Sequence, residues 1–227
     1  MTDFSKTRAF FDLPKGVIYM DGNSLGPLPR TVPERLNAVA RAEWGQMVIT
    51  GWNRAGWMTM PRRIGDRLGS LIGAEKGTVV VGDTLSIKVY QALASALEMR
   101  PDRKVILSDT GNFPSDLYMT EGLIRSLGQG HELRLAEPGS LEDAISDDLA
   151  VLLVTEVDYR TGRRHNMQRL IDKAHRIGAL VIWDLAHSAG AFPVNVSGLN
   201  ADFAVGCTYK YLNAGPGAPA FIYVAPR

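Results

Sequence analysis

The chain has 227 residues, of which 45% are hydrophobic and 22% charged, so its composition is that of a folded globular protein and not a disordered one. Lysine and arginine number 25 against 24 aspartates and glutamates, and this balance argues against a dedicated nucleic-acid binder. The opening segment lacks the apolar core of a signal peptide, and no apolar run approaches the roughly 18 residues of a membrane span.

The first third of the chain predicts an extended arm followed by helices. Residues up to about Pro33 are rich in glycine and proline and predict an arm with turns. Apolar spacing predicts a helix over 31–44, glycines and tryptophans indicate a loop over 45–57, and helical spacing returns over 62–72. We therefore expect two parts: an arm, helix and loop at 1–60, and a larger domain at 61–227.

From residue 79 onward, short apolar runs alternate with helical patterns. The expected strands are 79–81, 104–108, 150–155, 179–184, 201–206 and 221–224, and the expected helices are 86–99, 115–127 and 167–177. Strands without polar alternation are buried on both faces, and helices between them form crossovers. The fold class is therefore α/β, with a mostly parallel (mixed) sheet flanked by helices. Ligands of such sheets bind beyond the carboxyl ends of the strands.

Two polar residues stand beyond such strand ends. Asp184 closes the run ALVIWD, and Lys210 follows the run AVGC. Taken singly, Asp184 is as well explained by a helix cap or a salt bridge, and Lys210 is better explained by a structural role. Taken together, they suit pyridoxal 5'-phosphate, because a lysine binds its aldehyde and an acid keeps its ring nitrogen protonated.

Three further segments suit the rest of such a cofactor, although each has an ordinary structural explanation. Thr84 and Ser86 precede or begin a helix and suit a phosphate, but residues of this kind are first of all helix caps. Phe113 follows a strand and suits the apolar face of a ring, or is simply a loop aromatic. Thr155 ends a strand and suits the ring edge, or is an ordinary β-branched strand residue.

The remaining candidates favour packing and surface roles. His131, His165 and His175 fit surface or helix positions, and the Gly215–Gly217 segment fits a turn because the strand–GxGxxG–helix context is missing. Cys207 is the only cysteine, so we expect no internal disulfide, no metal site, and a location in the reducing cytoplasm.

The sequence resembles the kynureninases, pyridoxal phosphate enzymes of the aspartate aminotransferase-like fold. The resemblance extends over nearly the whole chain. Its carrying segments are MDGNSLGPLP at 20–29, NFPSD at 112–116, TEVDYRTGRRH at 155–165, WDLAHSAGA at 183–191 and GCTYKYLNAGPGAPAF at 206–221. The last two segments together are highly specific, and NSLG separates this family from cysteine desulfurases and other class V aminotransferases.

The resemblance implies a role for each matching residue. Lys210 would hold the cofactor covalently, Asp184 would pair with the ring nitrogen, and Tyr209 would help to bind phosphate and supply protons. The remaining cofactor contacts would be Leu85, Ser86, Phe113, Pro114, Ser115, Asp116, Thr155 and His187. Ser24 and Trp52 would line the substrate pocket.

The implied reaction is the hydrolysis of L-kynurenine, or its 3-hydroxy form, to anthranilate or 3-hydroxyanthranilate and L-alanine, in tryptophan degradation. The family acts as a homodimer on a small amino acid. Family members run on well beyond residue 227, into a small domain that holds the substrate carboxylate. We therefore expect exposed apolar surface where that domain would pack. The alternatives are a non-catalytic fragment that binds cofactor or supports dimer assembly, and a desulfurase-like lyase, which would need a mobile catalytic cysteine.

Overall fold

The computed structural model describes residues 4–226, and its centre is a sheet of seven strands. Residues 1–3, the start of the expected arm, and residue 227, the end of the expected domain, lie outside the described residues. In spatial order the strands are β3 (Val79–Val81), β9 (Phe221–Val224), β8 (Phe203–Gly206), β7 (Leu180–Asp184), β6 (Leu149–Thr155), β4 (Val105–Asp109) and β5 (Glu132–Ala136). From β8 to β5 every neighbouring pair is parallel, whereas β9 runs antiparallel to both β8 and β3. The expected mixed α/β sheet is confirmed.

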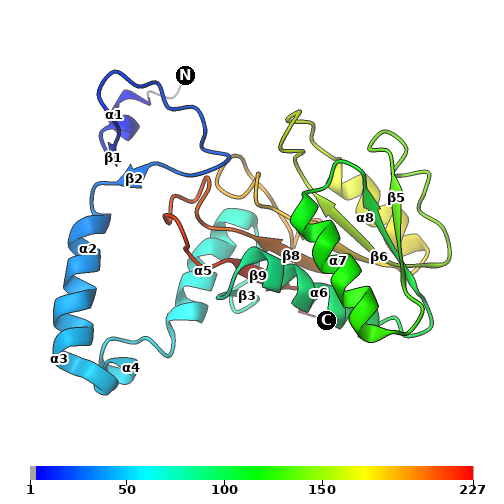
Figure 1. Ribbon diagram of the computed structural model, residues 1–227, viewed down its shortest axis with the longest axis horizontal. Helices are drawn as coiled ribbons and strands as arrows, with labels where there is room; N and C mark the ends of the chain where they lie inside the picture. The colour runs from blue at the N-terminus through cyan, green and yellow to red at the C-terminus, as the bar shows by residue number, and fades with distance from the viewer. Residues whose placement is uncertain (1–3, 227) are drawn as a thin grey trace.

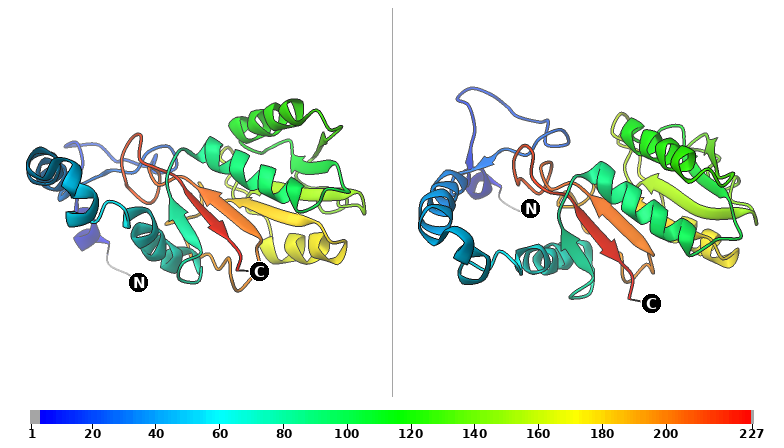
Figure 2. Two further views of the ribbon diagram at one scale, coloured as in Figure 1. Left: turned by 90° about the horizontal axis from the view of Figure 1, so that it is seen from below. Right: turned by 60° about the horizontal axis from the view of Figure 1, so that its bottom comes forward.

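Helices cover both faces of this sheet (Figures 1 and 2). On one face lie α6 (Leu85–Glu98) and α7 (Pro114–Leu127), and on the other lie α5 (Met60–Ile72) and α8 (Met167–Arg176). The core strands send alternate side chains to the two faces. Leu152 and Val154 of β6 pack in the cluster with α5 and α8, while Val151 and Leu153 pack in the cluster with α6 and α7.

Residues 4–59 form an arm and a column of helices beside the sheet (Figure 1). The arm holds α1 (Ser5–Arg8) and the short pair β1 (Phe11–Asp12) and β2 (Leu28–Pro29). The column consists of α2 (Val32–Ala38), the π-helical η1 (Val39–Trp44), α3 (Gly45–Met47), the 3-10 turn η2 (Val48–Thr50) and α4 (Gly51–Arg54). The loop expected over 45–57 is therefore wrong for its first part, because these residues continue the column as short helical turns.

Apolar side chains are exposed along the arm and the column. Ile18 and Met20 are each 86% exposed, Ile49 is 72% exposed, and Trp44 is 69% exposed. Large apolar side chains exposed to water do not stabilise a monomer, so this surface suits contact with another domain or another chain. Its cover by the small domain of the family stays a prediction.

The approach of α5 to β3 gives a testable consequence. A Cβ on Gly65 would overlap the carbonyl oxygen of Val79, whose backbone is fixed in the sheet. We expect Gly65→Ala to lower the free energy of unfolding by about 1–3 kcal/mol, as overpacking does. Gly122 of α7 has open space around its Cα, so Gly122→Ala should instead raise stability by about 0.5–1 kcal/mol. Urea unfolding of both variants measures the contrast, and equal effects would contradict this packing.

Candidate active site

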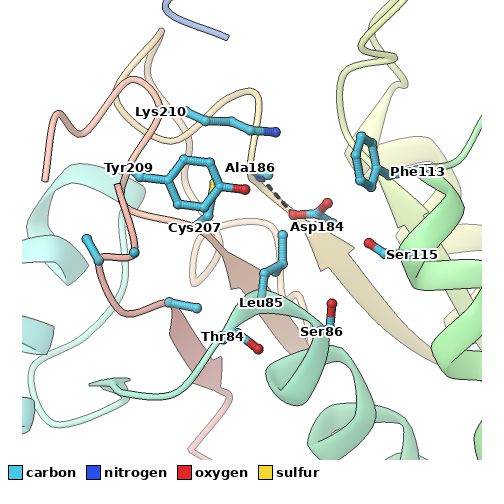
Figure 3. Close-up of a pocket in the computed structure, with 13 residues that line it drawn as sticks. Thr84, Leu85, Ser86, Phe113, Ser115, Asp184, Ala186, Cys207, Tyr209 and Lys210 are labelled. Atoms are coloured by element: carbon cyan, nitrogen blue, oxygen red, sulfur yellow. Dashed lines mark hydrogen bonds between the residues drawn. The ribbon is translucent and has the colours of Figure 1, made fainter. Parts of the chain in front are cut away.

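A cavity of about 280 Å³ lies beyond the carboxyl ends of β7 and β8. The cavity is surrounded by the amino-terminal ends of α6 and α7 and by the loops that follow β7 and β8 (Figure 3). The loop after β8 carries Lys210 and continues to β9. Its lining residues are Thr84, Leu85, Ser86, Phe113, Ser115, Asp184, Ala186, Cys207, Tyr209, Lys210, Gly217, Ala218 and Ala220. Segments that are distant in the sequence therefore meet at the edge of the sheet where ligands of this architecture bind.

Lys210 is a buried lysine whose amine enters this cavity. Only 7% of the residue is exposed, and its Nζ lies 2.6 Å from Nε2 of His187. The same Nζ lies 5.4 Å from the centre of the Phe113 ring. Figure 3 shows the side chain reaching across the cavity from the loop after β8. A buried amine with an apolar ring on one side has the setting of a reactive lysine.

Asp184 is the last residue of β7 and is 1% exposed. Its Oδ1 accepts a hydrogen bond from the Ala186 N–H at 2.8 Å, and its Oδ2 accepts one from the Thr155 hydroxyl at 3.2 Å. Burial raises the pKa of Asp184, while the Ala186 N–H, His187 and Lys210 act in the opposite direction. The carboxylate is therefore held in place by two hydrogen bonds, and within residues 4–226 no cation forms an ion pair with it to offset its burial.

Asp116 is a second buried carboxyl, on the first turn of α7. Among residues 4–226 its Oδ2 has no hydrogen-bond partner, its Oδ1 accepts a long bond of 3.4 Å from Ser115, and its carboxyl interacts with that of Asp184. Burial first, and then the charge of Asp184, raise the pKa of Asp116 well above its usual range. Two neighbouring carboxyl groups with an unused oxygen form a site that favours a positively charged hydrogen-bond donor.

Thr155 and Asn112 connect the two parallel strands β4 and β6 at this edge. The Thr155 hydroxyl is in hydrogen-bond contact with both the Asp184 carboxylate and the Asn112 side-chain oxygen. The Asn112 amide in turn donates to Ser108 at 2.9 Å, and its oxygen accepts the Phe113 N–H at 2.8 Å. This buried network fixes the entry to α7. Asn112 was not among the expected site residues, although it is a polar residue directly after a strand.

Phe113, Pro114 and Ser115 lie together at the beginning of α7. Phe113 and Ser115 line the cavity, whereas Pro114 begins the helix, is exposed, and is not a lining residue. The Phe113 ring makes an edge contact with Tyr159, with centroids 5.1 Å apart. Tyr159 thus supports the ring from the loop after β6, a role that the sequence analysis did not assign.

The amino-terminal end of α6 forms the opposite wall. Thr84 caps the helix through its side-chain oxygen, which accepts the Ile87 N–H at 3.5 Å, so its ordinary role as a cap holds alongside its place in the cavity. Leu85 and Ser86 follow it on the first turn. This turn presents N–H groups and the positive end of the helix dipole to the cavity.

Tyr209 and Cys207 border the cavity next to Lys210. Burial first, and then Cys207, raise the pKa of Tyr209 to about 12, so its hydroxyl stays protonated at neutral pH. Burial also raises the pKa of the Cys207 thiol, which is 3% exposed. Cys207, Ala186 and the Gly217–Ala220 segment were not predicted to form this wall, because small and apolar residues carry no chemical signal in a sequence.

Ser24 and Trp52 are not among the residues that line the cavity. Ser24 lies in an exposed turn of the arm, although nearby Gly26 donates its N–H to the Tyr209 carbonyl at 2.8 Å. Trp52 is in α4, 47% exposed, and packs edge-on against Trp57 with centroids 6.1 Å apart. Their substrate roles stay predictions.

Two of the remaining histidines differ from expectation. His131 and His165 are each only 8% exposed, so their assignment to the surface is wrong. His165 is buried because its Nε2 pairs with Asp109 at 2.7 Å, whereas His175 lies on α8 as expected. Within residues 4–226 there is no cluster of three or more ligands suited to a metal ion, and no helix long and apolar enough to span a membrane.

Comparison with known proteins agrees with this fold. The family model for class-V aminotransferases matches residues 70–224, and the chain belongs to this family. Among curated relatives, the kynureninase of Burkholderia pseudomallei (strain 1106a) is 52% identical over 225 residues. The alignment covers 97% of this chain and 54% of that protein, so the chain spans about half the length of the curated relatives it matches. The resemblance to kynureninases is thereby confirmed.

Solved structures share the fold. An apo cysteine desulfurase from Thermococcus onnurineus NA1 superposes with a TM-score of 0.77 at 24% identity, covering 100% of this chain and 58% of that one. A cysteine desulfurase from Escherichia coli gives a TM-score of 0.78 at 19% identity over 99% of this chain and 58% of that one. At these identities the likeness establishes architecture alone.

Proposed function

We propose that this chain binds pyridoxal 5'-phosphate in the cavity and forms part of a hydrolase that converts L-kynurenine, or its 3-hydroxy form, to the corresponding anthranilate and L-alanine. The observation that carries the proposal is the convergence of Asp184 and Lys210 on one cavity from the ends of neighbouring strands. The kinship with curated kynureninases supports the substrate. The reaction belongs to tryptophan degradation.

The cofactor ring fits the acidic end of the cavity. A protonated pyridine nitrogen would bring a positive charge to the buried Asp184 and Asp116 carboxyls, and it would bring a hydrogen-bond donor to the acidic end where Asp116 Oδ2 has no partner among the described residues. Thr155 holds the Asp184 oxygen in place, and Phe113 offers a ring for stacking. His187 would lie beside the cofactor, next to the Lys210 amine.

The phosphate fits the opposite end. Backbone N–H groups of Leu85 and Ser86 on the first turn of α6 would bind it, because a helix amino-terminus favours an anion. The Tyr209 hydroxyl faces into the same cavity and would donate a further hydrogen bond (Figure 3). Pro114 and Ser115 set the direction of the helix that presents Phe113.

When bound, the cofactor supplies an electron sink for a substrate carbanion. Lys210 would hold the cofactor through its aldehyde, and its amine, when free, would remove the proton from the substrate α-carbon. Asp184 would face the ring nitrogen and keep a proton there. Tyr209 donates protons as water adds to the side-chain ketone and the Cβ–Cγ bond breaks, which suits a hydroxyl that is protonated at neutral pH.

A second candidate is a cofactor-binding part without turnover of its own. The observation that favours it is that Ser24 and Trp52, the two expected substrate contacts, are not among the residues that line the cavity. A desulfurase finds less support, because the Cys207 thiol is buried in the wall and protonated rather than carried on a mobile loop.

The proposed assembly is a homodimer in the cytoplasm. The exposed apolar surface of the arm and column would be shared between the family's small domain and a second copy, and the single buried cysteine suits a reducing compartment.

One experiment separates the two functions. We expect addition of pyridoxal 5'-phosphate to produce a visible absorption band that borohydride abolishes, and addition of L-kynurenine to produce anthranilate fluorescence. The band without anthranilate would favour the cofactor-binding part over the hydrolase. Absence of the band, with the chain folded by circular dichroism, would overturn the proposal.

A further inference from the structure

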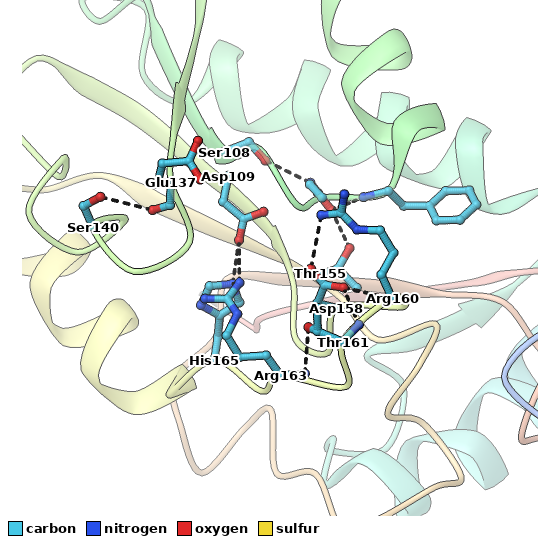
Figure 4. A network of polar contacts seen from close by, with 12 residues as sticks. Ser108, Asp109, Glu137, Ser140, Thr155, Asp158, Arg160, Thr161, Arg163 and His165 are labelled. Carbon is cyan, nitrogen blue, oxygen red and sulfur yellow. Dashed lines mark hydrogen bonds and ion pairs between the residues drawn. The ribbon is translucent and has the colours of Figure 1, made fainter.

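The hairpin formed by residues 156–165 follows β6 and is internally braced. Val157 and Arg164 pair across it, and the His165 N–H donates to the Glu156 carbonyl at 2.9 Å. At its tip, the Asp158 carboxylate accepts the N–H groups of Arg160 at 2.8 Å and Thr161 at 3.0 Å (Figure 4). A side chain that caps two successive N–H groups fixes the turn.

The hairpin is also anchored to the end of β4. Asp109 Oδ2 accepts a hydrogen bond from Nε2 of His165 at 2.7 Å and lies 3.4 Å from Nη2 of Arg163 (Figure 4). Gly111 passes so close to the Asp158 carboxylate that a Cβ there would lie 2.7 Å from it. The hairpin is therefore held from both sides, and its backbone carbonyls have fixed positions.

One of those carbonyls contacts His187. The Val157 carbonyl lies 3.0 Å from Nδ1 of His187, and a carbonyl only accepts, so Nδ1 must carry a proton. Burial first, and then the charge of Lys210, lower the pKa of His187, which favours the neutral ring. A neutral imidazole protonated at Nδ1 has a bare Nε2, and this atom lies 2.6 Å from the Lys210 amine.

We propose that the 156–165 hairpin is a positioning element: its Val157 carbonyl holds His187 as the Nδ1-protonated tautomer, so that the Nε2 lone pair accepts a hydrogen bond from Lys210 and aims the amine into the cavity. Asp158 acts through the turn it caps, and because its charge also acts on His187, the Asp158→Asn variant separates the turn from the charge. The use of this aim for aldehyde capture rests on the proposed function, whereas the tautomer itself does not.

The test measures the tautomer directly in the cofactor-free chain labelled with ¹⁵N-histidine. Two-bond ¹H–¹⁵N spectra report which ring nitrogen is protonated, and loss of a signal in His187→Gln assigns His187 among the four histidines. We expect a single Nδ1-protonated form in the parent chain and a mixture of tautomers in Asp158→Ala. Asp158→Asn should restore the single form, because its amide oxygen accepts the same two N–H groups without the charge.

A matched control removes a cap of the same kind at the far end of the segment. Asn166 accepts the Arg169 N–H at 3.1 Å to cap α8, so Asn166→Ala should cost similar stability and leave the His187 tautomer unchanged. If Asp158→Ala fails to fold, Gly162→Ala takes its place, because Gly162 has φ +70° in the same turn and nothing within 4 Å of an added Cβ.

Three results would overturn the inference. They are an Nε2-protonated His187 in the parent chain, a tautomer that the hairpin variants leave unchanged, and an Asp158→Asn variant that behaves like Asp158→Ala. A second readout is the rate at which Lys210 captures pyridoxal 5'-phosphate, trapped by borohydride and read by peptide mass. We expect Asp158→Ala and Gly162→Ala to slow it by about tenfold or more, and Asp158→Asn to leave it near the parent rate. Failure of capture in the parent chain, with the tautomer as expected, would count against the proposed function alone.

Discussion

Replacing Lys210 by alanine should abolish covalent attachment of pyridoxal 5'-phosphate. The buried Lys210 amine lines the cavity and, in the proposed function, attacks the cofactor aldehyde, so alanine at this position leaves the aldehyde without a partner. We expect no visible band with the cofactor, no borohydride-reducible adduct by mass, and a loss of turnover of at least about a thousandfold wherever turnover exists.

Lys88 provides the matched control for this variant. Lys88 lies on α6 and, at 6% exposure, is buried to nearly the same degree as Lys210. Its amine forms an ion pair with Asp83 at 2.9 Å, and the residue does not line the cavity. Lys88→Ala should keep the reducible adduct on Lys210. An adduct that persists in Lys210→Ala would disprove the assignment of Lys210.

The second large effect is expected from Asp184→Asn. The substitution should lower turnover when cofactor is present, but it should not lower the stability of the cofactor-free chain. The isosteric amide still accepts the Ala186 N–H, but it cannot hold a proton on a ring nitrogen. We therefore expect turnover to fall by about a hundredfold or more, the usual range for loss of a positioned acid or base. In the cofactor-free chain, by contrast, stability at neutral pH should not fall.

The stability effect follows from the raised pKa of Asp184. A carboxyl whose pKa is higher in the folded than in the unfolded chain makes the folded state bind more protons between the two values. Its destabilising contribution is complete above the folded-state pKa and disappears as the pH falls to the ordinary value of 3.8. Unfolding measured from pH 4 to 7 should show a shallower fall with rising pH in Asp184→Asn. A steeper fall would contradict this assignment.

The sheet was predictable where its strands are apolar on both faces. The strands β6 and β7 are buried throughout, and such runs have no other stable place in a chain of this length. The edge strand β5 was not predicted, because its side chains are partly exposed and Leu135 is 45% exposed. Short helical turns at 45–54 were also missed, since glycine and β-branched residues disfavour helices until neighbouring segments hold them.

The charged residues of the candidate site were predictable from the sequence, and those that hold them in place were not. Asp184 and Lys210 could be identified because charged residues after buried strands need an explanation. Asn112 and Tyr159 act by holding their neighbours, and no spacing in the sequence shows which neighbours those are. The same holds for the burial of His165, which depends on an aspartate 56 residues away along the chain.

The Gly26 N–H donates a hydrogen bond to the Tyr209 carbonyl, and this bond joins the arm to the segment that contains Lys210. The glycine has no space for a side chain there, because a Cβ would overlap the Lys210 carbonyl and the Asn213 side chain. Deletion of the arm to improve expression would therefore remove a hydrogen bond that holds the segment containing Lys210. For protein engineering, we therefore expect a shortened chain to hold the Lys210 segment better if it keeps Gly26, even though the family match begins only at residue 70.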